Sequence, residues 1–211
     1  MSKSAAAGAA VDPRPYHHGD LRRALILAAE TVLERDGAQA LSLRAVAREA
    51  GVSPAAPYHH FKDKEELMLA VGKAGFGKLN VELAAAATGR ADLGDRLSNI
   101  GVAYVEFAQQ HPATYRVMYD TARRVDAMPH AEEHDKTGFS MVKDAIREAA
   151  GGEISEVDAH LAAIAAWCAV HGLAEMRGFA EFQPLKAELG GEEAFLRGVL
   201  SHIMFARKTH H

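Results

Sequence analysis

The chain of 211 residues follows a helical pattern of apolar residues almost throughout, and glycine and proline divide that pattern into segments. Apolar residues recur every three or four positions, which gives each segment one apolar face. No window shows the alternation of apolar and polar residues that predicts a half-buried strand. We therefore predict an all-α fold. The expected helices span residues 20–36, 43–50, 54–61, 64 onward, 93–110, 113–120, 130–150, 156–178 and 192–208.

Signals for helix ends support these boundaries. Side-chain oxygens suited to N-caps precede four of the expected helices, at Asp20, Ser42, Asp63 and Ser155. Gly37 and Gly51 suit the backbone conformation that ends a helix. We expect the first three helices, which are separated by short turns, to form a compact unit. A loop is expected around Pro184 and residues 190–191.

The segment Gly51-Val52-Ser53-Pro54 predicts a tight turn between two short helices. Ser53 is the expected N-cap of the second helix, and Pro54 occupies its first position, where a missing N–H costs nothing. Val52 supplies an apolar side chain to the bundle. This arrangement is a helix-turn-helix, whose second helix enters the DNA major groove. A helical bundle in which the turn is coincidental is the alternative.

Residues 42–67 extend the motif into a longer pattern, in which Tyr58 and Phe61 form a Tyr-x-x-Phe step followed by Lys-Asp-Lys-Glu-Glu-Leu. This segment resembles the amino-terminal signature of the tetracycline-repressor-like (TetR) family. The resemblance implies that the first three helices bind DNA and that the fourth joins them to a ligand-binding core. It also implies that the last two long helices form a dimer.

The same resemblance indicates which side chains contact DNA. Tyr58 and Lys64 suit phosphate oxygens, which position a protein without reading sequence. His59 reaches a base edge or a phosphate, and the methyl groups of Ala55 and Ala56 suit thymine methyls. The expected DNA contacts are Arg44, Ser53, Ala55, Ala56, Tyr58, His59 and Lys64.

Pro57 departs from the family pattern, which has a larger aliphatic residue at this position. It lacks the N–H for an early intrahelical bond. We expect an altered tilt of the recognition helix and the loss of one apolar anchor.

Charge is distributed unevenly along the chain, whose net charge is −4. Residues 14–64 hold eight basic and six acidic side chains, a net of +2, so the remainder carries −6. A mildly basic amino-terminal part on an acidic body suits DNA binding at that end.

The body from Lys78 onward has no Gly-x-Ser-x-Gly, phosphate-binding glycine loop or His-Glu-x-x-His motif, so we predict no enzyme and no cofactor. Its helices carry aromatic and methionine side chains of the kind that line ligand pockets, although such residues more often fill a core. The candidate ligand-binding residues are Tyr104, Phe107, Tyr115, Met118, Tyr119, Met141, Trp167 and His171.

Trp167 and His171 lie four residues apart and share a helix face. The Trp-x-x-x-His-Gly pattern is similar to one in a subgroup of TetR-like carboxy-terminal domains. His171 either hydrogen-bonds a ligand or bonds a backbone group or a tyrosine inside the core. Both interpretations remain open, as do a DNA-binding protein without a ligand switch and a helical enzyme or lipid carrier.

The last two long helices have broad apolar stripes that suit a homodimer around a two-fold axis. The expected interface residues are Leu161, Ile164, Cys168, Leu196, Val199, Leu200 and Ile203. Cys168, the single cysteine, is expected to be a buried, inert thiol.

The remaining features indicate a cytoplasmic protein, since no segment reaches the apolar length of a membrane span and no disulfide can form within the chain. We predict a disordered tail over residues 1–15, a DNA-binding domain over 16–63, a ligand-binding and dimerisation domain over 64–208 and a short tail over 209–211. His130 and His134 have metal-ligand spacing, but a solvated helix surface is favoured and no metal is expected. His210 and His211 are either native or the remnant of a purification tag, so they carry no argument about a site.

Overall fold

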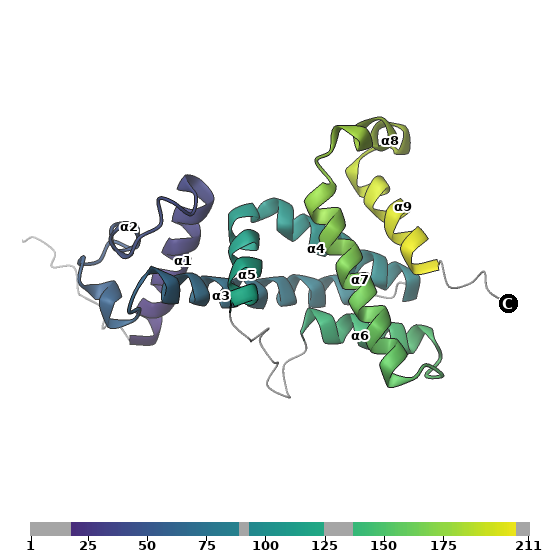
Figure 1. Cartoon of the computed structure of the whole chain (residues 1–211), viewed down its shortest axis with the longest axis horizontal. Helices are drawn as coiled ribbons and strands as arrows, with labels where there is room; N and C mark the ends of the chain where they lie inside the picture. The colour runs from purple at the N-terminus through teal and green to yellow at the C-terminus, as the bar shows by residue number, and fades with distance from the viewer. Residues whose placement is uncertain (1–17, 89–92, 125–136, 206–211) are drawn as a thin grey trace, which may run out of the picture.

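The computed structural model describes residues 18–88, 93–124 and 137–205. Every regular element in these ranges is a helix (Figure 1), which confirms the predicted all-α fold. The α-helices are α1 (His18–Asp36), α2 (Leu43–Glu49), α3 (Lys64–Ala87), α4 (Leu93–Gln110), α5 (Pro112–Arg124), α6 (Gly138–Ala149), α7 (Glu156–Met176), α8 (Gln183–Leu189) and α9 (Glu192–Phe205). Two 3-10 helices, η1 (Ala56–His59) and η2 (Ala180–Phe182), precede α3 and α8.

The buried apolar residues form two separate clusters. The first, here called the head core, joins α1, α2 and the first turns of α3 and includes Phe61 and Val117. The second, the body core, joins the later turns of α3 from Phe76 onward to α4, α5, α6, α7 and α9. Figure 1 shows α3 running lengthwise from the head to the body. Helix α3 begins at the expected domain boundary after residue 63 and contributes to both cores. The position of that boundary therefore remains a prediction.

Local capping determines where several helices begin and end. Ser42 accepts a hydrogen bond from the N–H of Ala45 at 3.1 Å, and Asp63 accepts one from Glu66 at 2.9 Å. Ser155 caps α7 in the same way. Gly37, with φ of +81°, follows the last residue of α1. These N-caps satisfy N–H groups that have no partner inside the helix, and the sequence predicted each of them correctly.

Other predicted boundaries need correction. Helix α1 begins at His18, so Asp20 lies inside it and is not its N-cap. The segment around Pro184 is not a loop, because η2 and α8 form there and proline fits the first turn of a helix. Helix α5 is longer than expected and reaches Arg124. Helix α6 begins at Gly138, capped by Thr137, and residues 125–136 lie outside the described residues.

Helix α7 is long and apolar enough to cross a membrane, judged by length and composition alone, contrary to our sequence expectation. It packs against α4 and α6 on one side and exposes Leu161 and Ile164 on another. Apolar residues on two sides of one helix account for its composition. Its length and composition are therefore weak evidence for a membrane span.

Two glycines allow α3 and α5 to approach closely. A Cβ built on Gly72 would lie 2.4 Å from Oγ1 of Thr121, and one on Gly75 would lie 2.7 Å from Cγ of Met118. A larger residue at either position would have to displace the side chain of Thr121 or Met118, so these glycines allow the two helices to pack tightly.

Candidate DNA-reading head and effector site

The turn between α2 and η1 has the geometry expected of a helix-turn-helix. Gly51 adopts a φ of +68°, which favours glycine. The N–H of Val52 donates to the carbonyl of Ala47 at 3.0 Å, and the Val52 side chain packs against the head core. The chain therefore reverses direction over three residues, and Val52 anchors the turn as predicted.

The element after the turn is a short 3-10 helix, Ala56–His59, rather than the predicted α-helix over residues 54–61. The N–H of Ala56 bonds to the carbonyl of Ser53 at 3.0 Å, and no side chain caps the helix, so Ser53 is not its N-cap. Pro57 explains the difference. It cannot donate to Ser53, and it disfavours α-helical geometry at the residue before it.

Pro57 itself is buried, so the expected loss of an apolar anchor is wrong. Phe61 is also buried in the head core, and the guanidinium of Arg22 lies 5.1 Å from the centre of its ring. Two apolar side chains, one at each end of this short segment, therefore hold it against α1 and α2.

The predicted DNA contacts lie on and around this element, most of them exposed. Tyr58 is 54% exposed, and Arg44, Ser53, Ala55 and His59 are exposed as well. Ala56 and Lys64 are half-buried. The ammonium of Lys64 donates to the carbonyl of Ala38 at 2.7 Å, which ties the start of α3 to the loop before α2. An ammonium has three protons, so this bond leaves two for a phosphate.

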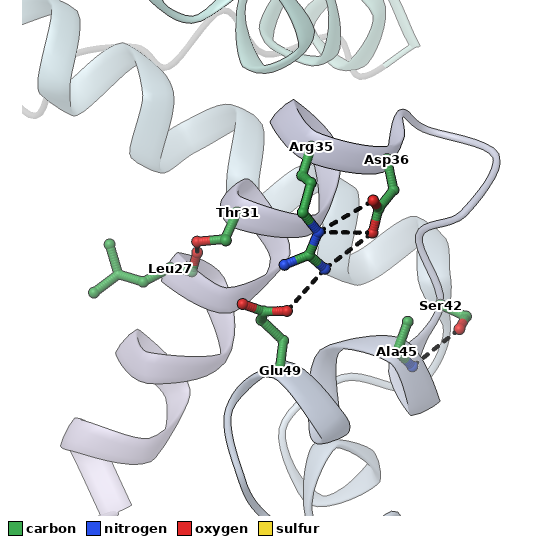
Figure 2. A network of polar contacts seen from close by, with 7 residues as sticks. All are labelled: Leu27, Thr31, Arg35, Asp36, Ser42, Ala45 and Glu49. Atoms are coloured by element: carbon green, nitrogen blue, oxygen red, sulfur yellow. Dashed lines mark hydrogen bonds and ion pairs between the residues drawn. The ribbon is translucent and has the colours of Figure 1, made fainter.

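An ion-pair network that the sequence did not predict joins the ends of α1 and α2. Figure 2 shows the guanidinium of Arg35 between the carboxylates of Asp36 and Glu49. It lies 2.9 Å from each of them. The hydrogen bond from Arg35 lowers the pKa of Asp36 below its ordinary value. The pairing with Glu49 helps to fix the angle between the two helices that precede the turn.

A cluster of four polar side chains lies inside the body. The hydroxyl of Tyr104 is 2.5 Å from that of Tyr119 and 3.2 Å from that of Tyr115. Nδ1 of His171 lies 2.5 Å from the hydroxyl of Tyr115 and 3.2 Å from that of Tyr104. We call these four residues the polar cluster. They come from α4, α5 and α7, and Trp167 packs edge-on against Tyr104.

Burial keeps the polar cluster uncharged near neutral pH. It raises the pKa of Tyr104, Tyr115 and Tyr119 and lowers the pKa of His171. A neutral imidazole has one donor and one acceptor nitrogen, so Nδ1 either accepts a hydrogen bond from the hydroxyl of Tyr115 or donates one to it, according to which nitrogen carries the ring proton. Of the two interpretations that the sequence left open for His171, the structure shows the tyrosine partner.

A small apolar cavity of about 30 Å³ lies beside the polar cluster. Tyr104 belongs to both, because its ring lines the cavity and its hydroxyl joins the cluster. The lining residues are Leu83, Leu97, Ile100, Gly101, Tyr104, Val142, Ala166, Trp167, Ala169, Val170 and Leu200. Most of these aliphatic residues were not predicted, because a leucine or valine at helical spacing looks the same in any core.

The other predicted ligand residues have different surroundings. Phe107 and Met118 are fully buried; Phe107 lies next to the ring of His111, and Met118 fills the space above Gly75. Met141 is half-buried against the body core. None of these three lines the cavity, so they are core residues in this structure.

The predicted dimer residues separate into two groups. Leu161 is 56% exposed, Ile164 is 47% exposed, and Cys168 is exposed rather than buried as we expected. Leu196 and Leu200 are buried in the body core, so neither side chain is available to a second subunit and both predictions are wrong. Val199 is half-buried, and the side chain of Ile203 lies outside the described residues.

Further exposed apolar residues lie outside the predicted set. They are Val157, Met176, Phe179, Leu185 and Leu189, on α7, on α8 and in the segment between them. Among the described residues no three His, Cys, Asp or Glu side chains come together as metal ligands. His130 and His134 lie outside the described residues.

The chain combines a helix-turn-helix head, a long connecting helix and a larger helical body. This combination defines the class of one-component DNA-binding regulators. The family model described as "Bacterial regulatory proteins, tetR family" matches residues 25–71, and the model described as "Tetracyclin repressor-like, C-terminal domain" matches residues 97–200. Together they match most of the chain. The protein therefore belongs to the tetR family and is a transcriptional regulator with a helix-turn-helix DNA-binding domain.

Individual relatives agree with this assignment. The HTH-type transcriptional regulator BetI of Rhizobium meliloti (strain 1021) is 34% identical over 106 residues, which are 49% of this chain and 52% of that protein. The match thus spans about half the length of the curated relative. The narrower Trp-x-x-x-His-Gly subgroup remains a prediction.

Two solved structures are similar over nearly the whole fold. A protein of unknown function from Rhodococcus sp. RHA1 is 33% identical, with a TM-score of 0.72 over 92% of this chain and 97% of that one. A putative transcriptional regulator from Pseudomonas aeruginosa PAO1 is 22% identical, with a TM-score of 0.66 over 90% of this chain and 91% of that one. The second likeness concerns the fold alone.

Proposed function

We propose that this protein is a homodimeric repressor that binds a palindromic operator in the cytoplasm and leaves it when a small apolar or amphipathic molecule enters the body. It acts by binding and not by catalysis. The observation that carries the proposal is the polar cluster, three tyrosines and a histidine inside an otherwise apolar core, next to a cavity.

The composition of this region suits an effector. Ligand pockets in proteins are mostly apolar, with a few converging polar groups that orient the ligand. Here the cavity walls are apolar, and the polar cluster offers hydroxyl donors and acceptors at one end. An apolar molecule with one hydrogen-bonding group matches both surfaces.

The cavity is too small for an effector in the arrangement that the structure describes. About 30 Å³ holds one or two water molecules and no larger ligand. An effector therefore has to bind an arrangement in which the helices have moved apart. Only a difference in affinity between two arrangements can shift their populations. Leu83 of α3 lines the cavity, and α3 begins directly after the recognition element, so a moved α3 changes the position of the head.

Dimerisation supplies the operator geometry. The exposed residues Leu161, Ile164 and Cys168 lie along one side of α7 and offer an apolar surface to a second copy. Two heads held about 34–36 Å apart read successive major grooves on one side of DNA. Each head alone reads a half-site, so a dimer reads a palindrome.

Mobility shifts with the DNA upstream of the protein's own gene, and with genomic fragments selected for binding, test the reading head. Tyr58→Ala and Lys64→Ala should each weaken binding, and Lys64→Ala should lower the salt slope by about one. Lys73→Ala, an exposed lysine further along α3, is the matched control and should bind normally. Equal binding to selected and random DNA would contradict the proposal.

Release is tested by screening small apolar and amphipathic compounds for thermal stabilisation of the DNA-free protein. Each stabilising compound is then added to the mobility shift, where we expect it to weaken operator binding. His171→Phe should abolish the effect of a compound that uses the polar cluster. Stabilising compounds that leave operator affinity unchanged would contradict ligand release.

A second candidate function is DNA binding without a ligand switch. Every hydroxyl of the polar cluster already has a hydrogen-bond partner within the cluster, which favours this alternative. The small volume of the cavity favours it as well. A protein that binds its operator tightly and is stabilised by no compound would support this alternative.

A further inference from the structure

The carboxylate of Glu34, near the end of α1 in the head, lies at the amino terminus of α5. Its Oε2 accepts a hydrogen bond from the N–H of Ala113 at 3.1 Å, and its Oε1 accepts one from Thr114 at 2.8 Å. The first N–H groups of a helix have no partner within that helix, and a negative charge there interacts favourably with the helix dipole. A side chain of the head therefore holds α5 through both carboxylate oxygens.

Helix α5 contributes side chains to both cores. Val117 is buried in the head core, and Ala113 packs against that core. Tyr115 and Met118 are buried in the body core. Tyr115 directly follows Thr114, and its hydroxyl forms a hydrogen bond with Nδ1 of His171. The first turn of α5 thus contacts Glu34 on the head side and the polar cluster on the body side.

The packing of α5 on α3 limits the ways in which α5 can move. Gly72 and Gly75 bring the two helices into close contact, and the side chains of Thr121 and Met118 fill the space above them. A shift of α5 away from the polar cluster therefore displaces the two N–H groups that Glu34 holds. Helix α1 carries this displacement to α2, because Arg35 joins the end of α1 to Glu49.

We propose that Glu34 is a positioning residue that sets the orientation of the head according to the state of the polar cluster. The inference rests on the proposed ligand-controlled DNA binding and adds the residue through which the two sites are coupled. An effector that moves Tyr115 or Tyr119 displaces the first turn of α5. The carboxylate of Glu34 moves with the two N–H groups that it binds there, and α1 rotates as a result.

Hydrogen exchange of the full-length, DNA-free protein tests the proposal in a cycle of four proteins. These are the wild type, Tyr115→Phe, Glu34→Gln and the double variant. Tyr115→Phe removes the bond to His171 and serves as the perturbation of the cluster. It should speed amide exchange in α2 and η1 about fivefold, the low end of site-to-site coupling. With Glu34→Gln also present, the added effect of Tyr115→Phe on the head should fall below about twofold.

Glu106→Gln is the matched control, because Glu106 is an exposed glutamate of α4 that belongs neither to the polar cluster nor to the contacts of Glu34. It removes the same charge and should leave the fivefold effect of Tyr115→Phe intact. Glu34 is exposed, so Glu34→Gln should fold, which circular dichroism checks. An equal response to Tyr115→Phe with and without Glu34→Gln would overturn the proposal, as would no response in α2 and η1 of the otherwise native chain.

The cycle contains no DNA and no effector. A protein that binds no operator would therefore contradict the proposed function while leaving the exchange result to stand by itself. Conversely, ligand release with an unchanged response in Glu34→Gln would preserve the proposed function and reject Glu34 as its coupling residue.

Discussion

The head and the body differ in what occupies the centre of their cores. The side chains of the head core are apolar, and the charged groups around them are paired, as Arg35 is with Glu49 and the buried Glu30 is with Lys78. The body core contains three tyrosine hydroxyls, an imidazole and a cavity. Buried polar groups and voids lower stability unless they are fully bonded or filled. A reading element benefits from one fixed geometry, whereas a sensor needs a second arrangement close in free energy.

The largest expected effect comes from Phe61→Ala in the head core. Removing this fully buried ring should lower the free energy of unfolding by about 3–5 kcal/mol. Urea unfolding is followed by circular dichroism, which reports on all helices, and by fluorescence of Trp167, the only tryptophan, which reports on the body. We expect the circular dichroism midpoint to fall more than the fluorescence midpoint.

Leu27→Ala on the exposed side of α1 is the control and should change both midpoints little. If Phe61→Ala shifts both signals together by the same amount, head and body unfold as one unit. The comparison between two regions would then hold for composition and not for stability.

A smaller effect is expected where α3 packs on α5. Gly75→Ala introduces a Cβ 2.7 Å from Met118 and should destabilise the protein by about 1–3 kcal/mol. Gly77→Ala lies on the same helix with nothing within 4 Å of the added Cβ, and it should stabilise by about 0.5–1 kcal/mol. The pair is measured by urea unfolding. If Gly75→Ala stabilised the protein as Gly77→Ala does, α5 would be able to move aside at little cost in free energy.

The smallest effect is a pH dependence of the body. Burial lowers the pKa of His171, so at neutral pH the residue is unprotonated in both the folded and the unfolded state. As the pH falls below the ordinary histidine value, the unfolded state binds a proton first and the folded state loses stability. The loss continues until the pH passes the lowered pKa of the folded state.

His171→Phe should therefore lose less stability than the wild type between neutral pH and about pH 5, as measured by urea unfolding with Trp167 fluorescence. The comparison uses the change with pH, because the variant also removes the hydrogen-bond partner of the Tyr115 hydroxyl. The same pH dependence in both proteins would mean that His171 is not protected by burial.

Much of the head was predictable because its signals are local. Ser42 and Asp63 cap helices through bonds to residues three positions away, and Gly51 takes the backbone conformation that the turn requires. The recognition element was predicted in the right place but with the wrong helix type. Pro57 was identified as unusual, yet its burial depends on how the segment lies against α1 and α2.

Less of the body was predictable, because apolar residues at helical spacing do not reveal which face meets which neighbour. Leu161 and Leu196 both belong to apolar stripes, but the first is exposed and the second is buried among the subunit's own helices. Tyr104, Trp167 and His171 were selected from the sequence and lie together in the structure, whereas Phe107 and Met118, which were selected on the same grounds, are buried elsewhere in the core.

The sequence by itself determined the helical fold, the helix-turn-helix and the family, since each depends on residues within a few positions of one another. Only the tertiary structure decided the contacts between distant residues. Examples are Tyr115 with His171, 56 positions apart, and Glu34 with Thr114, 80 positions apart. Such pairs form because helix packing brings them together, and many other residues of the same type could pair equally well at the level of sequence.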